Sequence, residues 1–308
     1  MSVLVIGNAA IDIAFEVDHL PRAGESMLAK GRAVDAGGKG LNQAIAARRA
    51  GAEVRLLTAI GDDSSGAFLR ERLAAEGLAE DLLVRSGATD ESIIWLAPGG
   101  DNCIVTMDLM ARSISADDAE QALAALTPRD FLLMQGNLPG ATRPCFERAR
   151  ERGATTVLNP APMVIDHAGI WPLVDVAVVN EVESAELGGA AKPDVAATAL
   201  LDAGVGRVVV TLGPEGSLVV DQAGCHTVPT ERVTAVDTTG AGDVFCGTLA
   251  AGLDLGLDPL EAAGWAVRAA TLSVTRRGTS AAFPSTDELV VLRGTIASDS
   301  DRKDRGPP

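Results

Sequence analysis

The sequence lacks any apolar run of the roughly 18 to 20 residues that a helix needs to cross a bilayer. Its first residues, MSVLVIGNAAID, also lack the basic start and the small-residue cleavage site of a secretory signal. They begin directly with the pattern of a buried strand. We therefore expect a cytoplasmic protein without a membrane segment.

Cysteine and histidine are equally scarce. The four cysteines are scattered and form no C-x-x-C pair, and a chain of 308 residues can bury a sizeable core without disulfides. The three histidines have no regular spacing, which disfavours a zinc site or a histidine-based catalytic triad. We expect reduced core thiols without a redox role.

Positive charge is also in short supply. The chain has 26 Lys and Arg against 42 Asp and Glu, which gives a formal net charge of −16. Nucleic acid and anionic lipid carry the same sign, so neither is expected as a partner. A small substrate is favoured, and an anionic one would need local positive potential from backbone amides, a cation or isolated Lys and Arg.

What the sequence does contain is an alternation of apolar strand-like runs with helix-length segments. Strands are predicted at residues 3–7, 54–60, 131–135, 156–158, 174–179 and 208–212, and helices at 40–50, 65–76, 117–126, 143–152, 194–203, 242–254 and 259–275. Several of the strand runs are nearly continuous in Val, Ile and Leu. This is typical of an α/β domain whose parallel sheet is covered by helices on both faces.

Two regions, residues 11–35 and 92–108, interrupt the alternation with short β-like segments. Segments that leave an α/β core and return to it are candidates for a β lid over the carboxyl ends of the parallel strands. Edge hairpins without a function are the alternative. Residues 298–308 are polar and end in proline, so we expect a disordered tail after a single domain of residues 1–297.

Common nucleotide-binding motifs are missing. The chain contains no G-x-x-x-x-G-K-[ST], and its first strand leads into G-N-A-A-I-D rather than G-x-G-x-x-G. A P-loop fold and a dinucleotide-binding fold are therefore disfavoured.

A different glycine-rich turn stands at residues 240–243. Gly240, Ala241 and Gly242 lie where a loop enters an apolar helix, and small residues there allow successive N–H groups to point at one anion. Asp243 follows in the first turn, where it could receive the proton of an acceptor hydroxyl in phosphoryl transfer. The alternative is an ordinary helix N-terminus with a capping carboxylate.

A second candidate site begins with the glycine-rich residues 35–51. Gly38 allows close approach of the backbone to a ligand, Lys39 supplies a point charge, and Asn42 offers an amide that can pair with hydroxyls. Asp12 follows the first strand, where an open α/β sheet places ligand-binding side chains. A flexible surface loop and a turn-forming aspartate are the alternatives.

Together these motifs resemble the ribokinase (PfkB) family of sugar kinases. The resemblance covers about residues 3–293 and is carried by Pro21-x-x-Gly24-Glu25, by the Gly-Gly-Lys-Gly-x-Asn-Gln-Ala of residues 37–44, and by residues 61–63, 158–162, 180–183, 211–216, 236–247 and 274–278. It implies a three-layer ribokinase-like sandwich with a mostly parallel central sheet and a small β lid. It also implies MgATP-dependent phosphorylation of a sugar hydroxyl.

The resemblance assigns roles to individual residues. Asp243 would be the general base, and the amides of Gly240, Ala241 and Gly242 would stabilise the transferred phosphoryl group. The sugar would be held by Asp12, Gly38, Lys39, Asn42, Asn137 and Asp243, and the nucleotide by Asn180, Thr211, Gly213, Gly216, Ala241 and Gly242.

The resemblance also implies two cations. Glu183 would help to organise Mg²⁺ through water. Activation by K⁺ is common in this branch of the family, and the matching positions are Asp237, Thr239, Ser273, Arg276, Gly278 and Ala282. A homodimer that pairs its β lids is a further expectation.

Two departures from the family pattern concern the sugar. Ala10 stands where ribokinase has an asparagine, and Asn137 stands where it has a glutamate. Loss of these polar groups changes which hydroxyls can be satisfied, so a related pentose, a modified sugar, a polyol or a nucleoside is as compatible as ribose.

Two other functions stay open. A nucleoside kinase of the same fold would use apolar lid residues to stack on the base, namely Ile94, Leu96, Ile104 and Met107. A non-catalytic sugar or nucleotide sensor would be expected to have lost Asp243 or the glycine turn, and both are intact.

Overall fold

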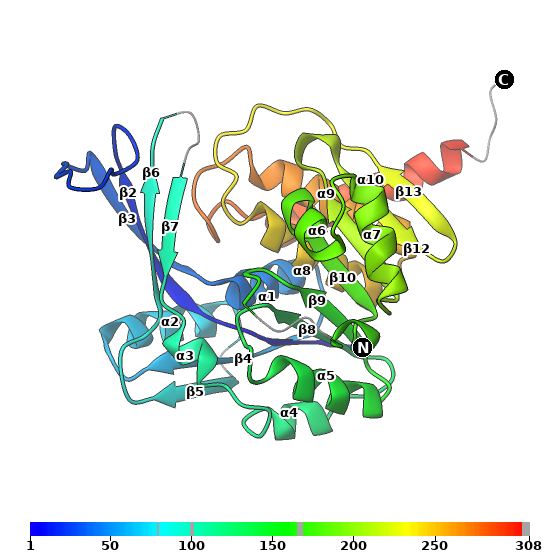
Figure 1. Cartoon of the computed structure of the whole chain (residues 1–308), viewed down its shortest axis with the longest axis horizontal. Coiled ribbons are helices and arrows are strands. Elements are labelled where there is room, and N and C mark those ends of the chain that lie inside the picture. The colour runs from blue at the N-terminus through cyan, green and yellow to red at the C-terminus, as the bar shows by residue number, and fades with distance from the viewer. Residues whose placement is uncertain (79, 99–101, 165–168, 304–308) are drawn as a thin grey trace.

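A nine-stranded sheet forms the centre of the computed structural model, which describes residues 1–78, 80–98, 102–164 and 169–303 (Figure 1). The strands lie in the order β13 (Gly224–Val228), β12 (Ser217–Asp221), β11 (Arg207–Thr211), β10 (Val176–Asn180), β9 (Thr155–Asn159), β8 (Phe131–Gln135), β1 (Val3–Ile6), β4 (Val54–Gly61) and β5 (Asp81–Arg85). The strands from β11 to β5 are parallel, and β12 and β13 add an antiparallel hairpin at one edge.

Helices cover both faces of this sheet and make three layers. The first face is covered by α1 (Lys39–Arg49), α2 (Ser64–Ala75), α8 (Ala241–Asp254), α9 (Pro259–Ser273) and α10 (Thr286–Lys303). The opposite face is covered by α3 (Leu109–Arg112), α4 (Glu120–Ala124), α5 (Thr142–Glu151), α6 (Glu181–Gly188) and α7 (Pro193–Asp202).

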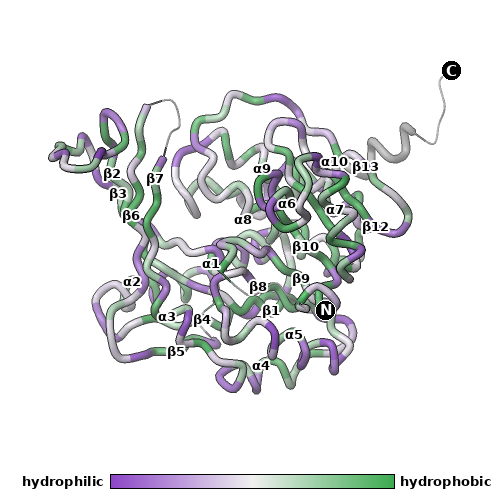
Figure 2. The backbone as a smooth tube through the Cα atoms, in the orientation of Figure 1, coloured by the Kyte–Doolittle hydropathy of each residue, from purple (hydrophilic) through white to green (hydrophobic). Residues whose placement is uncertain are grey.

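The alternation of side chains along β1 shows why the strands read as continuous apolar runs. Val3 and Val5 belong to the core under α1 and α8, whereas Leu4 and Ile6 belong to the core on the other face. Successive residues of a strand point to opposite faces, so a sheet covered on both sides needs apolar residues at every position. Figure 2 shows this as largely hydrophobic central strands, with hydrophilic residues concentrated in the surrounding loops.

A second, four-stranded sheet projects from the main body (Figure 1). Its order is β3 (Gly31–Gly37), β2 (Ala10–Glu16), β6 (Glu91–Leu96) and β7 (Asn102–Thr106). The segments 11–35 and 92–108 that interrupt the sequence alternation supply these strands, apart from residues 99–101, which lie outside the described residues. The α/β fold with a mostly parallel sheet and a smaller second sheet is therefore confirmed.

The predicted strands and most predicted helices are present with shifts of a few residues. The helix predicted at 117–126 is shorter and spans only Glu120–Ala124. Strands β5, β12 and β13 and helices α3, α6 and α10 were not predicted. Helix α10 extends to Lys303, so it includes the beginning of the segment predicted as a tail, and residues 304–308 lie outside the described part of the chain.

Within the described ranges, none of the helices combines the length and the apolar character needed to cross a membrane.

Candidate active site

The candidate site lies where helices α1 and α8 begin, at the carboxyl ends of the parallel strands. Glycines bring these elements together. A Cβ atom on Gly247 of α8 would lie 2.3 Å from the backbone oxygen of Gln43, and one on Gly40 would lie 2.6 Å from the backbone of Gly7. Because only glycine permits these approaches, α1 can pack closely on α8 and on the end of β1.

Asp243 is the third residue of α8 and is only 6% exposed. Its carboxylate accepts hydrogen bonds from Asn42 Nδ2 and Gln43 Nε2, both at 3.0 Å. The ammonium group of Lys39 forms an ion pair with it at 3.8 Å. The prediction that Asp243, Lys39 and Asn42 belong to one site is consistent with this arrangement.

The charge of Asp243 affects its neighbours. The carboxylate raises the pKa of Lys39 above its usual value, and the carboxylate of Glu183 contributes in the same direction. Lys39 is therefore a firmly charged cation at neutral pH, placed where α1 begins. It supplies the local positive potential that an anionic ligand needs in a protein of net charge −16.

A chain of buried amides fixes the second donor to Asp243. Gln135 Nε2 donates to Gln43 Oε1 at 2.8 Å, which directs the nitrogen of Gln43 toward the carboxylate. The same nitrogen lies 3.2 Å from Asn159 Oδ1, and Asn159 Nδ2 donates to the backbone oxygen of Val178 at 2.9 Å. This network was not predicted, although Gln43 and Asn159 both lie in motifs that carry the resemblance.

The turn before Asp243 has the geometry of an anion-binding site. Gly240 caps α8 with φ 76°, in the left-handed region that favours glycine. The amides of the first helical turn have no acceptor within the helix, and the helix dipole adds positive potential there. A Cβ atom on Gly242 would meet nothing within 4 Å, so the turn faces open space.

Asp12 lies on the other side of the site, in strand β2. Its carboxylate packs against Gly37, where an added Cβ atom would lie 2.0 Å from Asp12 Oδ2. Burial raises the pKa of Asp12 to about 6, and the negative charge of Asp243 adds to the effect. A carboxylate kept partly away from water, with no cationic partner among the described residues, is a suitable acceptor for the hydroxyls of a sugar.

Two buried amide oxygens, of Asn42 beside Asp243 and of Asn137 after strand β8, are available to a ligand. The Oδ1 atoms of Asn42 and Asn137 are buried and have no hydrogen-bond partner in the described part of the chain. Buried polar atoms without partners are rare in native proteins, and a bound ligand is one way to satisfy them. Gly38, with φ 95°, caps helix α1, which carries Asn42.

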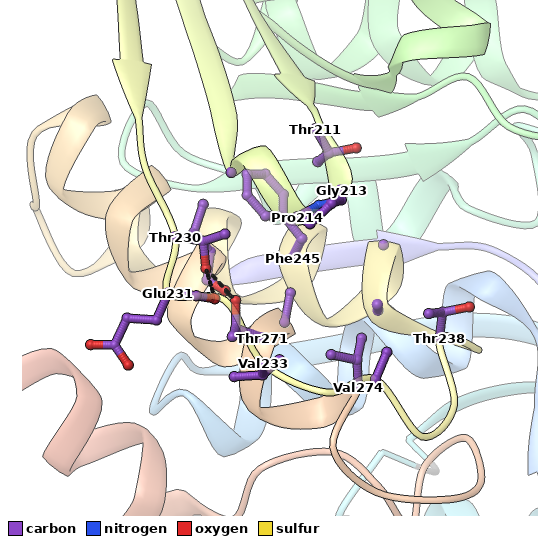
Figure 3. Close-up of a pocket in the computed structure, with 16 residues that line it drawn as sticks. Thr211, Gly213, Pro214, Thr230, Glu231, Val233, Thr238, Phe245, Thr271 and Val274 are labelled. Carbon is purple, nitrogen blue, oxygen red and sulfur yellow. Dashed lines mark hydrogen bonds between the residues drawn. The ribbon is translucent and has the colours of Figure 1, made fainter.

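A cavity of about 340 Å³ adjoins the glycine turn (Figure 3). Of the predicted nucleotide residues, Thr211, Gly213, Gly216, Ala241 and Gly242 line it. Its wall also contains apolar side chains that were not predicted, namely Val233, Phe245, Val267 and Val274. Phe245 lies on α8 and Val267 on α9, where the sequence pattern is that of ordinary core positions, whereas Val274 caps α9 and Val233 lies in the loop before α8.

Asn180 is not among the described residues that line this cavity. Asn180 Oδ1 accepts from the backbone N–H of Glu183 at 2.8 Å, and the backbone N–H of Asn180 donates to Glu183 Oε2 at 3.0 Å. This capping box starts α6 and gives both residues a role in the local structure. The pattern N-x-x-E could have predicted it.

The residues predicted for a monovalent cation lie on two adjacent segments. Asp237 joins them, because its carboxylate accepts from the backbone N–H of Thr239 at 2.9 Å and from that of Gly278 at 3.0 Å. This pair of hydrogen bonds is called the Asp237 clip. Ser273 and Ala282 are buried and lie near Gly278 in the sequence, and Arg276 pairs with Glu288. The carbonyl-bearing segments therefore lie together beside the Gly240 turn.

The model of the family described as pfkB family carbohydrate kinase matches residues 1–286. Ribokinase of Haemophilus influenzae is 31% identical over 294 residues, which cover 93% of this chain and 96% of the relative. Deoxyribokinase of Salmonella typhi is 29% identical over 298 residues, which cover 94% and 97%.

Solved structures agree with this result. Ribokinase of Thermotoga maritima matches with a TM-score of 0.86 and 31% identity over 94% of this chain and 98% of its own. Ribokinase of Arabidopsis thaliana, complexed with ribose and ATP, matches with a TM-score of 0.82 and 26% identity over 95% and 98%. The similarity therefore extends over the main body and the second sheet.

Proposed function

The chain belongs to the pfkB family of carbohydrate kinases, and on this premise we propose that it transfers the γ-phosphate of ATP to a hydroxyl of a small pentose, with Asp243 as the general base. That it is an ATP-dependent sugar kinase follows from the family. The proposal concerns the base, the sugar and the residues that hold both substrates.

One observation carries the proposal. Asp243 stands in the same helical turn as the open Gly242, which lines the cavity, and it accepts from Asn42, whose Oδ1 has no partner among the described residues; its charge also acts on Asp12. A nucleotide in the cavity would direct its phosphates toward the glycine turn, and a sugar held by Asp12 would present a hydroxyl to Asp243. Direct transfer requires an acceptor hydroxyl that reaches both the γ-phosphorus and the base.

The reaction follows from these positions. Asp243 takes the proton of the sugar hydroxyl as the oxygen forms its bond to the γ-phosphorus, and the bond between that phosphorus and the bridging oxygen of ADP breaks. The amides of Ala241 and Gly242 stabilise the charge on the equatorial oxygens. Asn42 and Gln43 hold the carboxylate in place, and Lys39 offsets the negative charge that gathers around it.

Mg²⁺ would accompany the nucleotide and neutralise phosphate charge. Glu183 is suited to hold Mg²⁺ through water, because its carboxylate is near enough to Lys39 for its charge to raise the pKa of that residue. Bound K⁺ would take carbonyl oxygens from the segments of Thr239, Ser273, Arg276, Gly278 and Ala282. The Asp237 clip, which joins these segments, supports that proposal.

The sugar pocket favours a pentose that lacks a hydroxyl or makes fewer polar contacts than ribose does in ribokinase. Ala10 is fully buried and places a methyl group where the family pattern has an amide. Asn137 replaces a carboxylate with a neutral amide whose Oδ1 has no partner among the described residues. We propose ribose and 2-deoxyribose as the substrates to compare first, since relatives of both kinds match the chain.

The small sheet would act as a lid over the sugar in a single kinase domain of residues 1–297, in a cytoplasmic protein. Its edge strand β7 is exposed along its whole length, including Ile104 and Val105. An exposed apolar edge strand favours pairing with another strand, which supports a homodimer formed through these sheets. Sedimentation of the purified protein would test the dimer.

An ATP-consumption screen tests the function. The acceptors are pentoses, 2-deoxypentoses, hexoses, polyols and nucleosides, each with and without K⁺. Preferred turnover of a free pentose is expected, with stimulation by K⁺. Turnover of nucleosides in preference to every free sugar would replace the proposal with a nucleoside kinase, and the absence of any acceptor would favour a sensor.

A further inference from the structure

Thr279 lies between the two halves of the site. Its side chain is buried, with 6% exposure. Its hydroxyl donates to Asp12 Oδ2 over 3.4 Å, and its methyl group lies against the glycine turn, where a Cβ atom on Gly240 would be 3.3 Å from Thr279 Cγ2. One short side chain therefore contacts both the carboxylate on the sugar side and the first residue of the anion-binding turn.

The segment that carries Thr279 is fixed on both sides. The backbone N–H of Gly278 donates to Asp237 Oδ2 at 3.0 Å. On the other side, the guanidinium of Arg49 donates to the backbone oxygen of Ser280 at 3.1 Å. Because both neighbours in sequence are held by charged groups of the main body, Thr279 has a defined position relative to both of its contacts.

The surroundings of Asp12 make a hydroxyl donor significant. The charged groups that face it, Asp243 and Asp35, are both acidic and oppose its ionisation. The hydroxyls of Ser92 and Thr279 act in the opposite direction and stabilise the carboxylate. Of these two donors, only Thr279 also contacts the glycine turn.

We propose that Thr279 is a positioning residue with two separable actions. Its hydroxyl orients the Asp12 carboxylate for the sugar, and its methyl group holds the Gly240 turn that precedes Asp243. The proposal rests on the proposed function, since it takes Asp12 as a sugar ligand and the Gly240 turn as the phosphate site. It adds a residue that couples the two.

The two actions can be separated by two conservative substitutions. Thr279→Val keeps the shape and a methyl group but loses the hydroxyl. We expect the KM for the sugar to rise roughly fivefold to tenfold, as for the loss of one hydrogen bond to a charged group, with kcat and the KM for ATP within about twofold. Thr279→Ser keeps the hydroxyl and loses the methyl group, so the KM for the sugar should stay near that of the wild type while kcat falls severalfold.

A double-mutant cycle with Asp12→Asn provides the decisive readout. If the hydroxyl acts through the carboxylate, Thr279→Val should add less than about twofold to the sugar KM once Asp12 is replaced. A general packing defect would instead add its full effect in both backgrounds. Thermal unfolding of each variant shows whether it is folded. If Thr279→Val does not fold, Thr279→Ser still tests the proposal.

The outcomes distinguish this proposal from the proposed function. An unchanged sugar KM in Thr279→Val, together with a raised KM in Asp12→Asn, would overturn the role of Thr279 alone. An unchanged sugar KM in Asp12→Asn, or a wild-type protein without sugar kinase activity, would overturn both. The separable actions would also be contradicted if both Thr279 variants showed the same decrease in kcat and the same increase in the KM for the sugar.

Discussion

The side-chain nitrogen of Gln43 donates to Oδ1 of Asp243 over 3.0 Å, although the two residues are 200 positions apart in the sequence. Gln43 cannot reverse its amide freely, because Gln135 donates to its oxygen. The orientation of the proposed base is thus set by two neutral side chains in the interior. Neutral donors hold the carboxylate in place without adding a second positive charge beside it.

Replacing the base should affect turnover most. We expect Asp243→Asn to lower kcat by about 10²-fold to 10⁴-fold with the best sugar, because a positioned general base contributes about that much. Asp202→Asn, at the exposed end of α7, is the matched control and should leave kcat unchanged. Steady-state kinetics checks this, and residual turnover of Asp243→Asn within tenfold of the wild type would show that another group is the base.

The donor to the base can be converted into an acceptor. Gln43→Glu would place a second carboxylate 3 Å from Asp243, so we expect kcat to fall by roughly 10-fold to 100-fold and the pH optimum to change, with little effect on the KM for ATP. Gln222→Glu, on the exposed hairpin between β12 and β13, controls for added surface charge. Equal kcat values for the two variants would contradict the positioning role of Gln43.

Sugar binding should weaken in acid. The pKa of Asp12 is raised to about 6, so protonation below that pH removes a hydroxyl acceptor that is ionised at neutral pH. We expect kcat/KM for the sugar to decrease as the pH falls through about 6, and Asp12→Asn to have low activity without this acid limb. Because the effect is on sugar binding, kcat at saturating sugar is measured beside kcat/KM and should change less. A limb that persists in Asp12→Asn would assign the titration to another group.

Close packing of α1 on α8 should be necessary for both stability and turnover. Gly247→Ala would put a Cβ atom 2.3 Å from the backbone oxygen of Gln43, which forces the helices apart. We expect a loss of about 2 kcal/mol or more in the free energy of unfolding and a lower kcat. In Gly264→Ala the nearest atom to the new Cβ would be Val228 Cγ1 at 3.9 Å, an ordinary contact, so this control should be neutral or slightly stabilising. Urea denaturation compares the two.

Much of the fold could be predicted because burial on both faces forces an unusual local pattern. Strands such as β1 and β8 are continuous apolar runs, and the helices between them have clear boundaries. Helix α6 escaped prediction since only Ser184 of its eight residues is buried, which leaves almost no hydrophobic periodicity. Strand β13 is mostly exposed and lacks it for the same reason.

The candidate site was predictable only where function requires special backbone. The glycine turn before Asp243 and the Lys39 loop were visible because glycine is needed there whatever the surroundings. The contacts of Gln43 with Asp243 and of Thr279 with Asp12 join residues 200 and 267 positions apart. Much of the apolar lining of the cavity looks like ordinary core in the sequence, because an apolar ligand pocket and a hydrophobic core are made of the same side chains.

Strand β3 ends at Gly37 and helix α1 begins at Lys39, so a single residue, Gly38, separates the small sheet from the helix that carries Asn42 and Gln43. With φ 95°, that residue is in a conformation that other amino acids rarely adopt. Changes in β3 that alter the preference for a sugar would therefore also alter the placement of the proposed base. We expect variants selected for a new sugar to lose turnover first, and compensating substitutions to arise in α1 or α8 rather than in the small sheet.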